Sequence, residues 1–401
     1  MNFKIALTIC FACCLVIIVS CKKKADAISF PPTNTLWLPY FGSDTSVIYY
    51  PDFRANYFVY SFKKPDNNTG IRIKGSYSQA RYLSFNVYDV STGNTSASIF
   101  DLNIMADNAS VNPFQPGVNL SNPNRNYTVD VLPTNSITTG LTNKLFYPGT
   151  IDSVSIFLRY YLPAGNNYGN VSLPTVEAFD ISTGKSIVLP RDFALVNSPS
   201  NPALITPLYS LADDTIRSYK FSSGTGLYAN ADNQYLLSPI VMDLSTKVAL
   251  VKIKLPTYAV TAAQNGTTDV RYFSFNEGDS YTKNYWGIYD SQLKVTNADG
   301  FTYLMISSPD VNLINKAATI GANFLEWKVP DTRMVLLYRN LLTNSSFSGN
   351  IQNVTLFNNA NFMGSKYSSN ARNFIGDYAP RGILVMKSAF LAATDITKLI
   401  P

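Results

Sequence analysis

The sequence predicts an all-β fold, most simply two related domains of the β-sandwich or jelly-roll type with little helix. Good helix formers are scarce, since Glu occurs only at positions 177, 277 and 326, whereas Asn, Thr, Ser and Tyr are abundant. Short runs of alternating apolar and polar residues recur along the chain, separated by clusters of turn-forming residues. Part of this pattern occurs twice, which indicates an internal duplication.

The first half of the chain contains five predicted strands. Turn-forming clusters separate them, such as the Pro-Asp-Asn-Asn-Thr-Gly run at 65–70, because these residue types favour the backbone angles of turns. The alternation of apolar and polar residues places the strands at 56–62, 71–75, 81–89, 98–105 and 127–132.

The second half repeats this style. Strands are predicted at 248–255, 271–276, 301–306, 333–341 and 383–387. Only residues 388–399 have the spacing of apolar side chains that is typical of a helix.

Two segments of the first half recur in the second half in the same order. Arg81–Asn86 (RYLSFN) matches Arg271–Asn276 (RYFSFN) 190 residues later, and 157–162 matches 337–342 more loosely after 180 residues. We therefore predict two β domains, at 38–190 and 207–401. They are joined by a linker at 191–206, within a stretch that holds prolines 190, 199, 202 and 207.

The N-terminus carries features of an export signal. Lys4 precedes an uncharged apolar run that ends at Val19, which is too short to span a bilayer but fits a signal peptide covering residues 1–20. The run closes with Ile-Val-Ser-Cys at 18–21, which resembles a bacterial lipobox. The resemblance implies that the thiol of Cys21 carries the lipid and that residues 21–37 form a tether. The alternative is an ordinary signal peptide that happens to end in Cys.

Lipidation of Cys21 places the protein in the bacterial cell envelope, with the outer membrane as the expected partner, facing either the periplasm or the outside. Three lysines at 22–24 follow the anchor and account for half of the net charge of +6. The folded part has no basic run, which disfavours nucleic acid as a partner.

Several chemistries are excluded by composition. The chain is 46% hydrophobic and 14% charged, so it is not disordered. It contains no His, and its four Cys lie within the first 21 residues, which rules out His-dependent triads, cysteine nucleophiles and His or Cys metal sites. The Asn- and Asp-containing loops at 230–233 and 297–300 are explained by Asx turns better than by Ca²⁺. We expect no metal and no cofactor.

The duplicated motif supplies the candidate binding residues. In both copies an Arg begins a strand face that is otherwise apolar, and such a charge must be paired or reach water. The arginine either forms a structural salt bridge or clamps an anion or a sugar with its planar fork of donors. The candidate ligand-binding residues are Arg81, Tyr82, Arg271, Tyr272 and Trp286.

Two further arginines and two carboxylates complete the candidates. Arg159 and Arg339 share their strand faces with apolar residues, so we interpret them as structural charges that need carboxylate partners. Glu277 and Asp279 lie close to aromatic residues, as expected for a glycan hydrolase that uses two carboxylates, although the same residues are typical of a polar turn.

The motifs resemble those of an uncharacterised family of exported bacterial proteins with a duplicated Arg-Tyr-x-Ser-Phe motif. The resemblance covers most of the chain after the signal, implies no known activity, and extends to the envelope lipoproteins of Bacteroidetes. Members of the family often carry Cys and His in the second half, and this chain has neither there. The matching segments are Gly75–Phe85, Val111–Gly117, Leu158–Pro163, Arg271–Asn276, Tyr338–Leu342 and Asp377–Arg381.

These observations favour a non-enzymatic binding or scaffolding module that is anchored by lipid and holds its ligand at the interface of the two repeats. The partner would be a glycan or a protein. The alternatives are a carboxylate-dependent glycan hydrolase acting near 277–279 and a purely structural surface lipoprotein.

Overall fold

The computed structural model describes residues 36–119, 122–134, 136, 140–189, 206–221, 228–294 and 297–400. The predicted signal peptide, Cys21 and most of the predicted tether and linker lie outside the described residues. By their mutual contacts, the described residues form a single compact unit.

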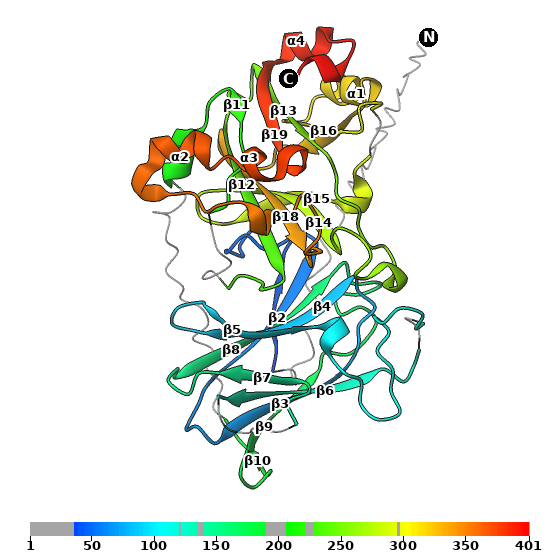
Figure 1. Cartoon of the computed structure of the whole chain (residues 1–401), viewed down its shortest axis with the longest axis vertical. Helices are drawn as coiled ribbons and strands as arrows, with labels where there is room; N and C mark the ends of the chain where they lie inside the picture. Colours follow the sequence, from blue (N-terminus) through cyan, green and yellow to red (C-terminus); the bar gives the residue numbers. More distant parts are fainter. Residues whose placement is uncertain are drawn as a thin grey trace, which may run out of the picture. The chain divides into compact units, whose positions relative to one another are not determined.

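The first half folds into two five-stranded sheets that pack face to face (Figure 1). We call these sheets A and B, and their strands are given below. Phe58, Phe85 and Leu158 of sheet A pack against Ile71 and Val129 of sheet B, so alternate residues of each strand are buried between the two sheets. Sheet A has the order β1 (Leu38–Phe41), β2 (Ala55–Lys63), β8 (Ser153–Tyr161), β4 (Tyr82–Asp89) and β5 (Thr95–Phe100). Sheet B has the order β10 (Ser186–Ile187), β9 (Thr175–Asp180), β3 (Thr69–Ser76), β6 (Asn126–Pro133) and β7 (Lys144–Tyr147).

The second half forms another pair of sheets. We call these sheets C and D, and their strands are given below. Phe275 and Leu336 of sheet D pack against Val251 and Leu304 of sheet C. Sheet C has the order β11 (Thr215–Ile216), β19 (Arg381–Met386), β13 (Lys247–Ile253), β16 (Thr302–Ser307) and β17 (Ala322–Glu326). Sheet D has the order β12 (Asn233–Val241), β18 (Arg333–Leu341), β14 (Tyr272–Gly278) and β15 (Asn284–Tyr289).

Eight strands of each half occupy corresponding places. The order β2-β8-β4-β5 of sheet A matches β12-β18-β14-β15 of sheet D, and β9-β3-β6-β7 of sheet B matches β19-β13-β16-β17 of sheet C. In both copies the last pair, β6 with β7 and β16 with β17, is parallel. The prediction of an all-β fold with two related sandwiches is therefore confirmed.

The helices are short and cover sheet faces. Helices α1 (Val311–Thr319) and α4 (Lys387–Ala392) lie next to each other in Figure 1, and their Leu313 and Phe390 pack on Val248 and Leu250 of β13. None of the helices in the described ranges has both the length and the hydrophobicity needed to cross a bilayer. The remaining helices are α2 (Phe362–Ser368), α3 (Arg372–Ile375) and the 3₁₀ turns η1 (Asp101–Asn103), η3 (Thr206–Leu211), η4 (Ala262–Gln264), η5 (Asp290–Gln292), η6 (Ile351–Asn353), η7 (Asn359–Asn361), η8 (Gly376–Tyr378) and η9 (Ile396–Lys398).

Most predicted strands agree with the structure, and the differences have local causes. The strand predicted at 98–105 ends at Phe100, because the chain turns into η1 at Asp101. The helix predicted at 388–399 is split into α4 and η9, because Asp395 caps a new turn by accepting the amide of Thr397. Helix α1 was not predicted, and its start is marked only by Asp310, which accepts the amides of Asn312 and Leu313.

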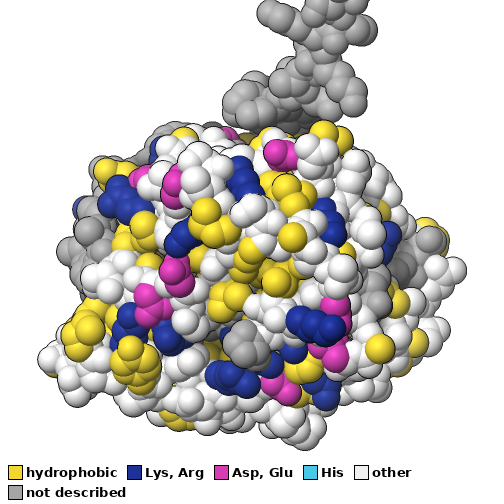
Figure 2. All heavy atoms as spheres, turned by 90° about the horizontal axis from the view of Figure 1, so that it is seen from above, with side chains coloured by type: hydrophobic (Ala, Val, Ile, Leu, Met, Phe, Trp, Pro, Cys, Tyr) yellow, Lys and Arg dark blue, Asp and Glu magenta, His cyan; other side chains and the backbone are white. Residues whose placement is uncertain are grey.

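The surface at the end of the molecule that carries α1 and α4 is mixed. Figure 2 shows Lys and Arg side chains interspersed with Asp, Glu and apolar side chains on this face. Mixed charge of this kind produces no extended field of one sign that would attract a polyanion to this face.

Candidate functional site

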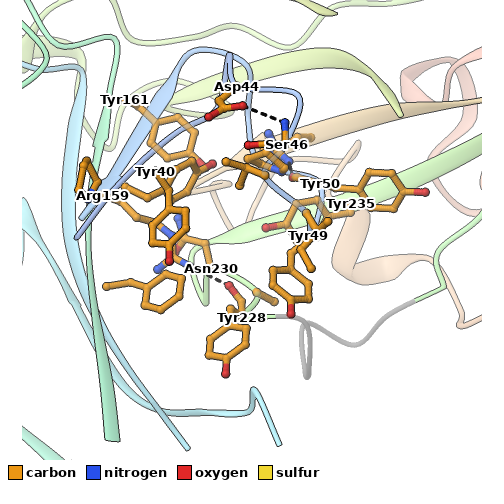
Figure 3. Close-up of a pocket in the computed structure, with 18 residues that line it drawn as sticks. Tyr40, Asp44, Ser46, Tyr49, Tyr50, Arg159, Tyr161, Tyr228, Asn230 and Tyr235 are labelled. Carbon is orange, nitrogen blue, oxygen red and sulfur yellow. Dashed lines mark hydrogen bonds between the residues drawn. The ribbon is translucent and has the colours of Figure 1, made fainter. Parts of the chain in front are cut away.

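A cavity of about 300 Å³ lies where sheets A and D approach each other. Seven tyrosines and two arginines line it, together with a single carboxylate, Asp44. Figure 3 shows Arg159 among several of these tyrosine rings. The lining residues are Pro39, Tyr40, Asp44, Ser46, Val47, Ile48, Tyr49, Tyr50, Pro51, Tyr57, Phe157, Arg159, Tyr161, Tyr228, Ala229, Asn230, Tyr235 and Arg339.

Two corresponding segments, which we call the arms, build much of the cavity wall. Arm 1 (residues 49–54) precedes β2 but contacts sheet D, since the amide of Phe53 donates to Asn276 Oδ1 at 3.0 Å. Arm 2 (residues 228–232) precedes β12 but contacts sheet A, since the amide of Ala231 donates to Asn86 Oδ1 at 3.2 Å. The arm of each half therefore packs against the other half.

A left-handed residue in each arm directs a backbone carbonyl at an arginine. Tyr50 has a φ of 48° and Tyr228 a φ of 52°, a region that non-glycine residues adopt only when other contacts hold them there. The Tyr50 carbonyl accepts a hydrogen bond from Arg339 Nη2 at 2.8 Å, and the Tyr228 carbonyl accepts one from Arg159 Nη2 at 2.7 Å. The repeated geometry shows that the two arginines hold corresponding positions.

Arg339 is fully neutralised. Its Nη1 lies 2.5 Å from Asp52 Oδ2, and only 2% of its side chain and none of that of Asp52 is exposed. Asp52 also accepts hydrogen bonds from the Tyr272 hydroxyl at 2.9 Å and from Ser274 Oγ at 2.7 Å. This arginine has the carboxylate partner that its position on a buried strand face requires.

Arg159 has no such partner. No Asp or Glu of the described residues lies within ion-pair distance of Arg159, although its side chain is only 2% exposed. Its guanidinium carbon instead lies 5.2–5.7 Å from the ring centres of Phe157, Tyr88 and Tyr57, at which distance the ring faces attract a cation.

The arginines of the duplicated motif form reciprocal ion pairs between the halves. Arg81 Nη1 lies 3.0 Å from Asp290 Oδ2, and Arg271 Nη1 lies 2.5 Å from Asp101 Oδ1. Each acid begins the 3₁₀ turn that follows the corresponding strand, β5 or β15. Burial raises the pKa of Asp290 to about 6 despite the opposing charge of Arg81.

The three aromatic candidates lie outside the cavity lining. Tyr82 and Tyr272 both pack edge-on against Tyr161, with ring centres 5.3 Å apart in each case. Trp286 packs on Phe53 of arm 1 at 4.8 Å. None of the five predicted ligand-binding residues lines this cavity, whereas the two arginines interpreted as structural charges do.

Glu277 and Asp279 are two positions apart in the sequence but make separate contacts. Glu277 is fully buried, and its Oε2 accepts the backbone amide of Lys328 at 2.9 Å. Burial raises the pKa of Glu277 to about 8. Asp279 accepts the amides of Tyr281 and Lys283 in a turn and the hydroxyl of Tyr285. Neither residue lines the cavity.

Sequence reasoning did not identify the arms or most of the tyrosines. A weak signal was present, because Tyr50-x-Asp52 recurs as Tyr228-x-Asn230 178 residues later, close to the offset of the second repeated segment. One identical and one similar residue are too few to be recognised without the structure. Among the described residues, no cluster of three or more Asp, Glu, Cys or His side chains is arranged to hold a metal ion.

Comparisons with known proteins concern the fold. No protein-family model and no curated protein matches the sequence. An uncharacterised protein from Burkholderia cenocepacia has a similar structure, with a TM-score of 0.55 and 9% sequence identity over 88% of this chain and 83% of that chain. A Vibrio parahaemolyticus protein has a TM-score of 0.39 and 10% identity, over 73% and 85%. The first similarity supports the all-β architecture, and the second is too weak to argue from.

Proposed function

We propose that this protein is a non-enzymatic binding protein, anchored by lipid in the bacterial envelope, whose small ligand occupies the cavity between sheets A and D. The observation that carries this proposal is the cavity itself, which is lined by seven tyrosines at the junction of the two repeats. Tyrosine combines a large ring with a hydroxyl, so such a lining stacks on ring faces and also forms hydrogen bonds.

The chemistry of the lining supports binding over hydrolysis. A carboxylate-dependent hydrolase needs two acids that face one cleft, and this lining contains only Asp44. The chain offers no His, and its only Cys after the predicted signal peptide is Cys21. The lining instead provides ring faces, hydroxyls and guanidinium groups, which are typical of a recognition site.

Ligand binding is tested by a thermal-shift screen with glycans, peptidoglycan fragments and small organic anions. A ligand present at about 100 times its Kd stabilises the fold by about 2.7 kcal/mol, which raises the melting temperature measurably. We expect the shift to be lost in Tyr49→Ala, since Tyr49 lines the cavity, and to persist in Tyr367→Ala, since Tyr367 is 62% exposed and outside the lining. Equal shifts in both variants would place the ligand elsewhere.

The lipid anchor rests on the lipobox-like sequence at 18–21. Cells grown with labelled palmitate are expected to label the wild-type protein, and Cys21→Ala is expected to abolish both the label and recovery in the membrane fraction. Cys14→Ala is the matched control, because Cys14 lies within the predicted signal and is removed with it. Label retained by Cys21→Ala would disprove the anchor.

A further inference from the structure

Asp52 and Asn230 occupy corresponding positions in the two arms. Oδ1 of Asp52 accepts the amide of Arg54 at 2.8 Å and the hydroxyl of Tyr272 at 2.9 Å. Oδ1 of Asn230 has equivalent neighbours: it accepts the amide of Asp232 at 3.1 Å and lies 3.2 Å from the hydroxyl of Tyr82, whose proton goes to Asp232 Oδ2 at 2.6 Å. The same bond from a backbone amide two residues further on therefore orients both side chains in the same way.

The remaining atom of each side chain differs in its chemistry. Oδ2 of Asp52 accepts a hydrogen bond from Arg339 Nη1. In arm 2 the corresponding atom is Nδ2 of Asn230, and the corresponding arginine atom is Nη1 of Arg159. Both are donors, both are buried, and neither has a hydrogen-bond partner among the residues that the structure describes. By this correspondence between the repeats, arm 2 has two donors where arm 1 and Arg339 have an ion pair.

Rotation of the Asn230 amide does not remove the conflict. If its oxygen and nitrogen were exchanged, Nδ2 would face the backbone amide of Asp232, which is itself a donor and needs the acceptor that Oδ1 now provides. The contacts of arm 2 therefore fix the amide with its nitrogen towards the arginine.

Among the described residues, no carboxylate neutralises the charge of Arg159. Asp232 is held by the hydroxyl of Tyr82 at 2.6 Å, and Asp44 accepts the amide of Ser46 within its own loop. Neither lies within ion-pair distance of Arg159, and Arg339 is already neutralised by Asp52. A buried guanidinium and a buried amide that both lack acceptors are satisfied together by a carboxylate, whose two oxygens accept from both.

We propose that Arg159 and Asn230 bind the carboxylate of a small ligand with a ring, and that the tyrosines of the cavity contact the ring. This inference rests on the proposed function and specifies its ligand class. Both donors belong to residues that line the cavity, together with the rings of Tyr40, Tyr161 and Tyr228 (Figure 3). An aromatic acid and a sugar acid share this chemistry, and the experiment separates them.

The test measures the binding of 4-hydroxybenzoate and of glucuronate to the full chain in detergent by calorimetry, each against an uncharged relative, 4-hydroxybenzamide or glucose. At least one acid is expected to bind the wild type about tenfold or more tightly than its uncharged relative, since a hydrogen bond to a charged group contributes this much. The acid that binds identifies the kind of ring.

Asn230→Asp is the decisive variant, because it places a carboxylate against Arg159 as Asp52 lies against Arg339. We expect it to raise the melting temperature of the unliganded protein and to weaken binding of the acid about tenfold or more. Arg159→Gln should weaken binding of the acid to the same extent, but without raising the melting temperature of the unliganded protein. Asn312→Asp, at an exposed position on α1, makes the same change in charge and should leave binding unchanged.

Each other outcome overturns the inference in a distinguishable way. If the acid still binds Asn230→Asp, or if the acid and its uncharged relative bind equally tightly, the carboxylate site is disproved. The proposal of a binding protein is unaffected by that result. If neither acid binds while other compounds of the thermal-shift screen do, the ligand class is wrong and the proposed function stands. If no compound binds at all, both the carboxylate site and the proposed binding function are wrong.

Discussion

Alanine in place of Asp52 is expected to lower the free energy of unfolding by about 3–5 kcal/mol, the range found when one partner of a buried ion pair is removed. The loss is large because Arg339 remains as a buried charge and because the donors of Tyr272 and Ser274 lose their acceptor as well. Urea denaturation of the variant and the wild type measures the difference.

An exposed ion pair serves as the control for Asp52→Ala. Asp331 lies 2.8 Å from Arg333, and the two side chains are 40% and 48% exposed, so solvent screens the pair and Asp331→Ala should leave the stability nearly unchanged. Changing Arg339 to Met in the Asp52→Ala background should restore part of the loss, because the uncompensated charge is then gone. A loss for Asp52→Ala as small as that for Asp331→Ala would contradict the interpretation.

Glu277→Gln is expected to make stability much less dependent on pH. The pKa of Glu277 is about 8 in the folded protein against an ordinary value of 4.5, so the folded state retains the proton more strongly than the unfolded state. Its contribution to stability is therefore complete below about pH 4.5 and is lost as the pH rises through about 8. Gln cannot ionise and avoids this loss.

The size of the effect follows from the raised pKa. Between about pH 5 and pH 9 the stability of Glu277→Gln relative to the wild type should rise by about 3–5 kcal/mol, measured by urea denaturation at each pH. Other titrating groups are common to both proteins and cancel in the difference. Glu177→Gln is the control, because that carboxylate is 44% exposed and should give a difference that is small at every pH. A flat difference for Glu277→Gln would show that its carboxyl is not destabilised by burial.

The exchange of arms explains how a duplicated protein comes to have an asymmetric cavity. Each arm provides a backbone carbonyl that accepts a hydrogen bond from the arginine of the other half, and each carries an Asp or Asn at the corresponding position. In one copy the side chain is Asp52 and neutralises Arg339, whereas in the other it is Asn230 and leaves Arg159 without a carboxylate. The change from Asp52 in one repeat to Asn230 in the other thus makes Arg339 a structural residue and Arg159 a candidate binding residue.

The strand pattern predicted much of this architecture, because alternation of apolar and polar residues is a local property. In β14, for example, Phe273 and Phe275 lie in the core of the second half, whereas Tyr272 on the opposite strand face packs against Tyr161 of the first half. The repeated motif indicated two related halves, and their strands follow the same order.

Which charges pair is a property of the tertiary structure alone. Arg339 meets an aspartate 287 positions away, and Arg271 meets one 170 positions away, so no window of sequence contains both partners. The cavity depends on the same long-range contacts, since its wall is made where each arm crosses to the opposite sheet. Local pattern and composition were enough to predict many of the strands, the duplication and the excluded chemistries, but not strands such as β12 and β15. Only the packing of the two halves decided which arginine is neutralised, because a buried charge is satisfied by whichever group the fold brings against it.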